Sequence, residues 1–176
     1  MLKKAKPILL KEGKFIRMMI QDGWEYVERT NCSGVVIILA MTDKAEIIFI
    51  SQYRIPVAKK VIEFPAGLIN DKSSRGNESL SKAAQRELLE ETGYRAQKIV
   101  KITEGPSTSG LSNDQLIVVR ALGLRKVARG GGDATESIRT YKVSLAKAEA
   151  WLKKMQGKGF LVDPKIYAGL YFFAKN

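Results

Sequence analysis

The chain has 176 residues, a formal net charge of +12 and a single cysteine, Cys32, and it has no histidine. This length suits one domain with a sizeable core, and the single cysteine excludes an internal disulfide bond. The lack of histidine excludes Cys/His zinc sites, Ser-His-Asp triads and Cys-His nucleophiles. A bound metal would need oxygen ligands, which favours Mg²⁺, Mn²⁺ or Ca²⁺.

The N-terminal sequence MLKKAKPILLKEGK is basic, but its apolar run covers only residues 8–10. That run is too short for a signal peptide, and no apolar stretch of the chain is long enough to cross a membrane. We therefore expect a cytoplasmic protein. The positive net charge suits an anionic partner such as nucleic acid, nucleotide or phosphate. The alternative is that the charge serves only solubility, and the charge alone does not decide between the two.

Strand signals dominate the first third of the chain. Residues 15–20 (FIRMMI) and 24–30 (WEYVERT) flank the turn sequence QDG, which predicts an antiparallel hairpin. The continuous apolar run 34–41 (GVVIILAM) is typical of a strand buried on both faces. Further strands are predicted at 45–54 and 59–67.

The remainder of the chain mixes helices and strands. After a polar loop, residues 79–92 predict a helix that Gly93 ends. The other predicted elements are strands at 98–103, 115–122 and 138–143, a Gly-rich loop at 129–137, a helix at 145–155 capped by Ser144, and a helix at 165–175. Strands in runs indicate the α+β class rather than alternating βαβ units.

The helix predicted at 79–92 carries acids in an unusual place. At 100° per residue, Glu87, Glu90 and Glu91 fall on the apolar half of the helix, whereas Arg86 falls on the other half. Acids on the apolar half face the body of the fold, where they would repel one another and resist desolvation. A bound divalent cation would offset both the repulsion and the cost of desolvation. The alternative is that the acids form salt bridges on an exposed helix surface.

Residues 86–94 (RELLEETGY) resemble the core of the Nudix box, with Glu78 at the expected distance upstream. The segments EFPAGLI (63–69), QYRIP (52–56) and GLSN (110–113) are similar to the branch of ADP-ribose pyrophosphatases and nucleoside-diphosphate-sugar hydrolases. The resemblance extends over most of the chain. One departure is a segment between Gly67 and Glu78 that is longer than in the usual box and is expected to form a surface loop.

The resemblance implies a Nudix fold, in which a mixed β-sheet is sandwiched between helices and an N-terminal antiparallel hairpin precedes it. It divides the chain into an N-terminal β-hairpin and dimerisation arm at 1–32 and a Nudix hydrolase domain at 33–176. Two strands alone bury too little apolar surface to be stable in water. We therefore expect the hairpin to pack on a second copy of the chain, and the resemblance implies a homodimer.

A divalent metal site is also implied by the resemblance. Glu87 and Glu91 would bind Mg²⁺, with Mn²⁺ possible, and Glu90 would bind a metal directly or through water. The backbone carbonyl of Ala66 would be a further ligand. Arg86 would orient the carboxylates through bidentate hydrogen bonds. Glu78 would support the site from the start of the helix, or it is only a capping acid.

Hydrolysis of a pyrophosphate also needs a base that takes a proton from water. Without histidine, a carboxylate is the expected base, and related enzymes often supply it from a loop before the last strand of the domain. The loop 129–137 holds Asp133 and Glu136. The sequence ESIRTYKVS resembles the family segment after that loop and favours Glu136; an ordinary loop acid is the alternative.

Four residues are candidates for binding the substrate. Arg54, within QYRIP, is expected to hold phosphate, and Arg29 is a weaker candidate for the same role. In the matching branch, aromatic residues at positions such as Trp24 and Phe15 sandwich the nucleobase, one from each subunit of a dimer. Stacking tolerates many bases, so it does not name the nucleotide. The alternatives are a surface arginine for Arg54 and strand packing for both aromatic residues.

Three functions compete at this point. The first is metal-dependent hydrolysis of nucleoside diphosphate sugars, with ADP-ribose giving AMP and ribose 5-phosphate as the best single guess. The second is a Nudix hydrolase of another nucleotide, such as a dinucleoside polyphosphate, NADH or a capped RNA end. The positive net charge is compatible with an RNA substrate. The third is a non-catalytic nucleotide-binding module, which would tolerate loss of the box acids. No box acid is lost here, and EFPAGLI with QYRIP favours the first function.

Overall fold

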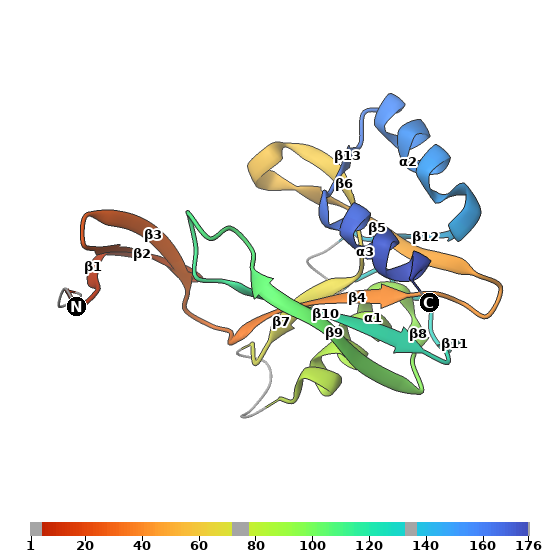
Figure 1. Ribbon diagram of the computed structural model, residues 1–176, viewed down its shortest axis with the longest axis horizontal. Helices are drawn as coiled ribbons and strands as arrows, with labels where there is room; N and C mark the ends of the chain where they lie inside the picture. Colours follow the sequence, from red (N-terminus) through yellow and green to blue (C-terminus); the bar gives the residue numbers. More distant parts are fainter. Residues whose placement is uncertain (1–4, 72–77, 133–136, 176) are drawn as a thin grey trace.

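The chain folds into a body built on two mixed β-sheets, from which a separate three-stranded sheet projects as an arm (Figure 1). The computed structural model describes residues 5–71, 78–132 and 137–175. Within these ranges, no helix is both long and apolar enough to span a membrane.

The arm consists of β1 (Ile8–Glu12), β2 (Ile16–Gln21) and β3 (Trp24–Arg29), all antiparallel. The predicted β2–β3 hairpin is confirmed. Its turn has positive φ at Asp22 (51°) and Gly23 (79°), the backbone that suits a two-residue hairpin loop. The strand β1 was not predicted, because its short apolar run is exposed at every residue and lacks the alternation of a half-buried strand.

The first sheet of the body has the order β7-β4-β10-β9. Its strands are β4 (Gly34–Ala40), β7 (Ala66–Ile69), β9 (Lys98–Pro106) and β10 (Gln115–Leu122). Alternate residues of β4 enter two different cores, with Val36 and Ile38 in one and Ile37 and Leu39 in the other. The prediction that this strand is buried on both faces is therefore confirmed.

The second sheet has the order β12-β5-β6-β13. Its strands are β5 (Glu46–Arg54), β6 (Lys59–Glu63), β12 (Arg139–Ser144) and β13 (Leu161–Val162). The single strand predicted at 59–67 is wrong, since β6 pairs with β5 whereas β7 pairs with β4 in the other sheet. Pro65, which lacks an N–H for the ladder, lies where the chain passes between the sheets.

Two very short strands, β8 (Tyr94–Arg95) and β11 (Arg125–Lys126), form a further antiparallel pair that was not predicted. They lie just after α1 and β10 in the chain. A two-residue strand carries too few side chains for a periodic signal.

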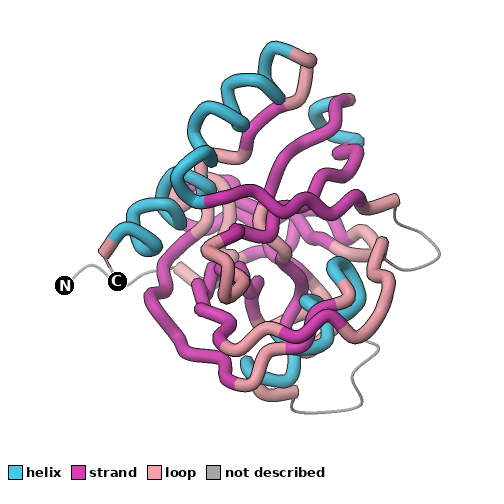
Figure 2. The backbone as a smooth tube through the Cα atoms, turned by 90° about the vertical axis from the view of Figure 1, so that its right-hand side faces the viewer, coloured by secondary structure: helices cyan, strands magenta, loops and turns pink. Residues whose placement is uncertain are grey.

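Among the described residues, the body has three longer helices: α1 (Leu80–Thr92), α2 (Ala148–Gly157) and α3 (Lys165–Ala174). Helix α1 lies on one side of the sheets, and α2 and α3 lie on the other (Figure 2). Ala83, Ala84 and Leu88 of α1 fill one core, whereas α2 and α3 contribute to the other. The α+β class with mixed sheets between helices is thereby confirmed.

The predicted ends of α1 are confirmed as well. Ser79 caps its first turn by accepting a hydrogen bond from the Lys82 N–H, and Gly93 follows it with φ 69°. The predicted cap of α2 is wrong. A short 3₁₀ turn, Leu145–Lys147, precedes that helix, and the Ser144 side chain makes no capping bond.

Candidate active site

A polar pocket of about 360 Å³ opens where β7 leads toward α1. We call it the acidic pocket. Three of the box glutamates line it together with three arginines. Its lining residues are Arg29, Val35, Gln52, Arg54, Ala66, Gly67, Leu68, Asp71, Arg86, Glu87, Glu90 and Glu91. All residues predicted to hold a metal and both arginines predicted to hold phosphate are therefore in one place.

Two glutamates of α1 pack directly against the start of β7. Glu91 is 3% exposed, and its Oε2 accepts a hydrogen bond of 3.0 Å from the Ala66 N–H. Glu87 lies against Gly67, where an added Cβ would stand 1.8 Å from the Glu87 Cδ. Only glycine leaves room for that carboxylate. The contact that places Ala66 here uses its N–H, so a metal-binding role for its carbonyl stays a prediction.

Arg86 connects three parts of the site. Its Nε and Nη2 donate to the two oxygens of Glu78 at 3.0 and 3.1 Å, and its Nη1 donates to Glu87 at 2.7 Å. Nη2 also donates to the Leu68 carbonyl at 3.0 Å. The hydrogen bonds with Glu78, then the charge of Glu87, raise the pKa of Arg86 above its usual value against the effect of burial. The guanidinium therefore stays charged and fixes both acids.

This arrangement corrects one sequence prediction and decides another. Arg86 was placed on the half of α1 away from the acids, but its guanidinium lies among them in the acidic pocket. A long side chain can reach around a helix, which a wheel of Cβ directions does not capture. Glu78 is not a capping acid, since Ser79 caps the helix and Glu78 instead binds Arg86.

Glu90 differs from its two neighbours. Its side chain is 48% exposed and lies 3.5 Å from the Arg86 Nη1. Glu87 and Glu90 share Arg86 as a partner, whereas Glu91 accepts from the Ala66 N–H. Within residues 5–71, 78–132 and 137–175 no three His, Cys, Asp or Glu side chains are grouped closely enough to hold a metal ion. The chemistry of the donors nevertheless fits a hard divalent cation, because carboxylate oxygens from two adjacent turns line a single pocket.

The two candidate phosphate-binding arginines are each held by a carboxylate. Arg54 binds Glu63 through two hydrogen bonds, Nε to Oε2 at 2.9 Å and Nη2 to Oε1 at 3.0 Å. The Arg29 Nε binds the Asp114 Oδ2 at 3.1 Å. Sequence reasoning assigned no role to Glu63 or Asp114. Both stand in or next to the quoted motifs EFPAGLI and GLSN, which is the signal that could have found them.

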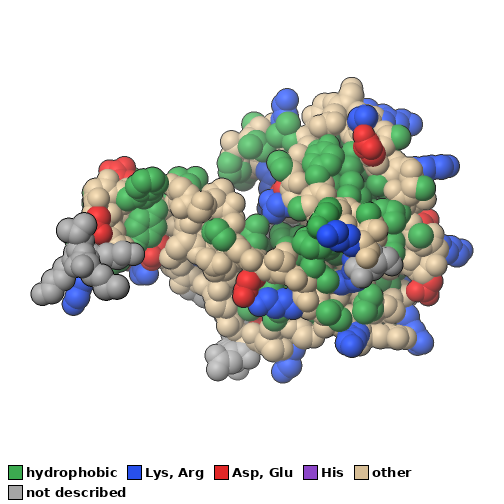
Figure 3. All heavy atoms as spheres, viewed as in Figure 1, with side chains coloured by type: hydrophobic (Ala, Val, Ile, Leu, Met, Phe, Trp, Pro, Cys, Tyr) green, Lys and Arg blue, Asp and Glu red, His purple; other side chains and the backbone are tan. Residues whose placement is uncertain are grey.

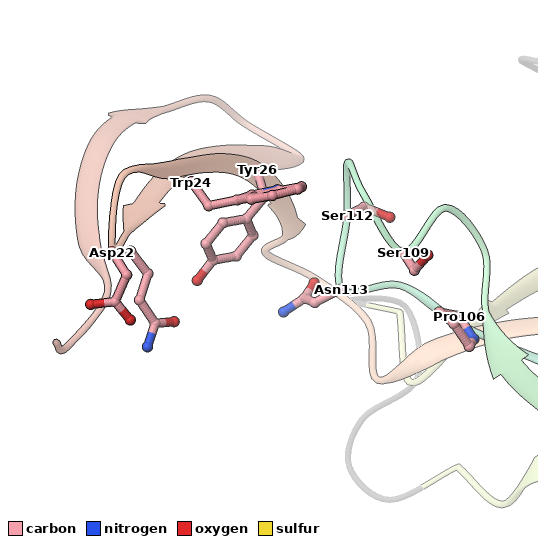
Figure 4. Close-up of a pocket in the computed structure, with 8 residues that line it drawn as sticks. Asp22, Trp24, Tyr26, Pro106, Ser109, Ser112 and Asn113 are labelled. Carbon is pink, nitrogen blue, oxygen red and sulfur yellow. The ribbon is translucent and has the colours of Figure 1, made fainter. Parts of the chain in front are cut away.

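A second pocket, of about 530 Å³, lies between the arm and the loop that joins β9 to β10 (Figure 4). We call it the arm pocket. Trp24 and Tyr26 of β3 form one wall and Ser109, Ser112 and Asn113 form the other. Tyr26 was not predicted, although its position two residues after Trp24 puts it on the same face of the strand.

Trp24 is 62% exposed, and its indole N–H donates to the Gly110 carbonyl at 3.2 Å. Phe15 does not line the arm pocket, and it is 54% exposed. Trp24 pairs with Gln21 at one end of the hairpin, whereas Ile16, the neighbour of Phe15, pairs with Arg29 at the other end. A single chain therefore does not bring the two predicted stacking residues together.

The two candidates for the general base, Asp133 and Glu136, lie outside the described residues, as do residues 72–77 of the longer loop. The residues just before position 133 form backbone hydrogen bonds with the last turn of α1. The Gly131 N–H donates to the Glu91 carbonyl at 2.9 Å and the Gly132 N–H to the Glu90 carbonyl at 3.1 Å. These two bonds satisfy carbonyls that the last turn of a helix leaves free.

Comparison with known proteins agrees with this geometry. The model of the NUDIX domain family matches residues 31–160. The chain belongs to the Nudix family. An uncharacterised Nudix hydrolase of Schizosaccharomyces pombe is 30% identical over 155 residues, covering 81% of this chain and 73% of that protein. The solved structure of an ADP compounds hydrolase matches with a TM-score of 0.74 and 19% identity, covering 98% of this chain and 92% of the other, and supports the Nudix fold.

Another relative carries a named activity. The ADP-ribose pyrophosphatase of Bacillus subtilis is 41% identical over 81 residues. The match covers 46% of this chain and 41% of that protein, so less than half of the length of this relative is represented.

Proposed function

We propose that this Nudix protein hydrolyses the pyrophosphate bond of nucleoside diphosphate sugars in a reaction that depends on Mg²⁺ or Mn²⁺. ADP-ribose, which would give AMP and ribose 5-phosphate, is the first choice of substrate. The observation that carries the proposal is the acidic pocket, which three of the box glutamates line together with Arg29 and Arg54. Relatives named for ADP-ribose pyrophosphatase activity support the choice of substrate.

The mixed charge of the acidic pocket suits a diphosphate bound together with a cation. Arg29 and Arg54 bind the anionic phosphates, and guanidinium matches phosphate geometry better than ammonium does. Glu87, Glu90 and Glu91 hold the divalent cation. The cation, when bound, neutralises phosphate charge and lowers the pKa of bound water. Arg86, fixed by Glu78, keeps the Glu87 carboxylate in place for this purpose.

The reaction replaces a bridging P–O bond by a bond from water oxygen to the same phosphorus. The attacking water loses a proton to a carboxylate, and the departing phosphate takes the electrons of the broken bond. We assign the proton acceptor to Glu136, with Asp133 as its competitor, because the sequence ESIRTYKVS resembles the family segment that follows such a loop. In the chain both acids follow Gly131 and Gly132, whose N–H groups bond to carbonyls at the end of α1.

Recognition of the nucleobase is assigned to the arm pocket. The exposed indole of Trp24 offers a stacking surface. Phe15 is proposed to reach the base from a second copy of the chain, because it lies at the far end of the hairpin from Trp24. The arm also exposes Ile8 (63%) and Ile16 (50%). Hydrophobic side chains are visible on the surface of the arm (Figure 3), and a homodimer would cover such apolar surface.

The experiment is a hydrolysis panel on the purified chain. We would compare ADP-ribose, ADP-glucose, GDP-mannose, UDP-glucose, NADH, diadenosine polyphosphates and capped RNA with Mg²⁺ or Mn²⁺, and separate the products by chromatography. We expect the highest kcat/KM for ADP-ribose, with AMP released, and loss of turnover when EDTA removes the metal. Turnover of NADH or capped RNA in preference to every sugar nucleotide would assign a different Nudix activity, and no turnover of any substrate would overturn the proposal.

A further inference from the structure

The Arg54–Glu63 ion pair lies at the edge of the acidic pocket, and only one of the two residues lines the pocket. Arg54 lines the pocket, whereas Glu63 does not. The Glu63 side chain is 14% exposed and that of Arg54 is 43% exposed. Glu63 therefore approaches the guanidinium from the protein side and leaves the more open side toward the pocket.

The contact uses one particular edge of the guanidinium. Glu63 accepts from Nε and from Nη2, and neither of these bonds uses Nη1. A guanidinium has a second fork, formed by its two terminal nitrogens, and either fork matches two oxygens of a phosphate or carboxylate. Occupation of the Nε side by Glu63 leaves the terminal fork for an anion in the pocket.

The backbone explains why Arg54 needs such a partner. Arg54 is the last residue of β5, and the exposed turn Ile55–Val57 follows it. In the β5–β6 ladder Arg54 pairs with Lys59, while Glu63 pairs with Ile50 farther along the strands. The ion pair thus draws the Arg54 side chain back along the sheet toward the end of β6, from which the chain continues to Ala66 in the acidic pocket. Without it, an arginine at the end of a hairpin would be free to extend into solvent.

We propose that Glu63 is a positioning residue for substrate binding: it fixes the Nε edge of Arg54 so that the terminal guanidinium fork binds the diphosphate of the substrate. This inference rests on the proposed function, since it takes a nucleoside diphosphate as the ligand of the acidic pocket. Glu63 acts only through Arg54 and touches neither the substrate nor the reacting atoms.

The central test is a double-mutant cycle of Glu63→Gln and Arg54→Ala, with ADP-ribose hydrolysis measured at saturating Mg²⁺. A glutamine has one acceptor oxygen instead of two and no negative charge, so it cannot form the paired contact of two oxygens with Nε and Nη2. We expect Glu63→Gln to raise KM about tenfold. This is the lower end of the roughly 10–100-fold loss seen in metal sites when a residue that orients a ligand-binding side chain is removed. The kcat should change less than about twofold. In the Arg54→Ala background the same substitution should change KM no further.

A second readout needs no turnover. The Kd of ADP, measured by calorimetry, should rise in parallel with KM for Glu63→Gln. Arg54→Lys, which keeps both the charge and Glu63, should weaken ADP binding similarly because an ammonium lacks the two forks. Glu63→Asp, which keeps the carboxylate but shortens its side chain by one methylene, should also raise the Kd of ADP, and it tests the inference should Glu63→Gln fold poorly. Glu46→Gln is the matched control. It removes the carboxylate of another cross-strand ion pair in the same sheet, in which Glu46 of β5 lies 3.8 Å from Lys142 of β12; neither residue lines the acidic pocket, so KM should stay unchanged.

The outcomes are distinct. A wild-type chain that neither hydrolyses ADP-ribose nor binds ADP would overturn the proposed function itself. With wild-type activity present, an unchanged KM for Glu63→Gln would overturn only the role of Glu63. A loss of kcat that persists in the Arg54→Ala background would show that Glu63 acts directly in the chemistry and would also overturn it.

Discussion

The acidic pocket and the arm pocket are built in opposite ways. In the acidic pocket the charged groups are fixed by partners: Glu91 by the Ala66 N–H of β7, Glu87 by its neighbour Arg86, which Glu78 holds in turn, and Arg54 by Glu63 of β6. The arm pocket has one aromatic wall, on which Trp24 is largely exposed, and it lies between two segments of the chain, the arm and the β9–β10 loop (Figure 4).

Besides the Arg29–Asp114 ion pair at the end of β3, single hydrogen bonds join the arm to the β9–β10 loop. The Trp24 indole donates to the Gly110 carbonyl, the Val27 N–H donates to the Leu111 carbonyl at 2.9 Å, and Asn113 donates to Glu28 at 2.9 Å. A metal and a phosphate must be held within fractions of an ångström for chemistry, whereas a stacked base tolerates some adjustment. The comparison therefore predicts that defects in the body lower kcat and that defects in the arm raise KM.

The largest effect is expected for Glu91→Gln. Glutamine keeps the oxygen that accepts from the Ala66 N–H, but it lacks the negative charge needed to bind a cation. We expect kcat for ADP-ribose to fall by at least about 100-fold, because removal of a direct metal ligand should cost more than removal of a residue that only orients one. The midpoint of urea unfolding in the absence of metal should be unchanged. Glu149→Gln, on the surface of α2, is the control. Retained activity together with a large loss of stability would mean that Glu91 has only a structural role.

A smaller effect on kcat, with a real loss of stability, is expected for Arg86→Ala. Removal of the guanidinium leaves the mostly buried carboxylates of Glu78 and Glu87 without their counter-charge. A fully buried pair would cost 3–5 kcal/mol, and partial exposure of Arg86 reduces the expected loss to about 1–3 kcal/mol. We expect kcat to fall roughly 10–100-fold. Urea unfolding and steady-state kinetics provide the measurements, and a variant as stable and as active as wild type would contradict the role given to Arg86.

The difference between the two regions also explains what the sequence could predict. The helix at 79–92, its ends and the gathering of Glu87 and Glu91 at the body follow from local periodicity and capping, and the structure confirms them. The partners Glu63 and Asp114 could not be assigned in this way. Their contacts depend on which strands and loops become neighbours, and that information is not present in any one segment of the chain.

The same limit explains the errors. A short exposed strand such as β1 has no periodic signal, so the arm was expected to be a hairpin rather than a three-stranded sheet. The split of residues 59–67 between two sheets depends on pairing with β4 and β5, which are separate partners in the fold. The length of the Arg86 side chain, rather than the direction of its Cβ, placed its charge among the acids.

On the arm, Trp24→Ala is expected to act on KM. Loss of one stacking aromatic residue costs about 1–3 kcal/mol of binding, or roughly 5–150-fold in KM, with little change in kcat because the base lies far from the reacting phosphorus. We also expect sedimentation to show a dimer. Unchanged kinetics of Trp24→Ala, combined with a monomer at working concentration, would leave Trp24 as an exposed residue without a role in recognition.

The smallest effect is expected for Asn113→Ala, which removes one contact between the arm and the wall of the arm pocket that the β9–β10 loop forms. Asn113 lines that pocket, and its Nδ2 binds the Glu28 Oε1, while Glu28 also binds Arg17 at 2.7 Å. Loss of one exposed hydrogen bond to a charged group should cost at most about 1 kcal/mol, or about fivefold in KM. The kcat and the midpoint of urea unfolding should stay at their wild-type values, because Glu28 keeps Arg17 as its partner. Lys101→Ala, in β9 and outside the lining of the arm pocket, removes a surface contact with Glu104 and serves as the control. A drop in kcat for Asn113→Ala without a change in KM would contradict the division of roles between the arm and the body.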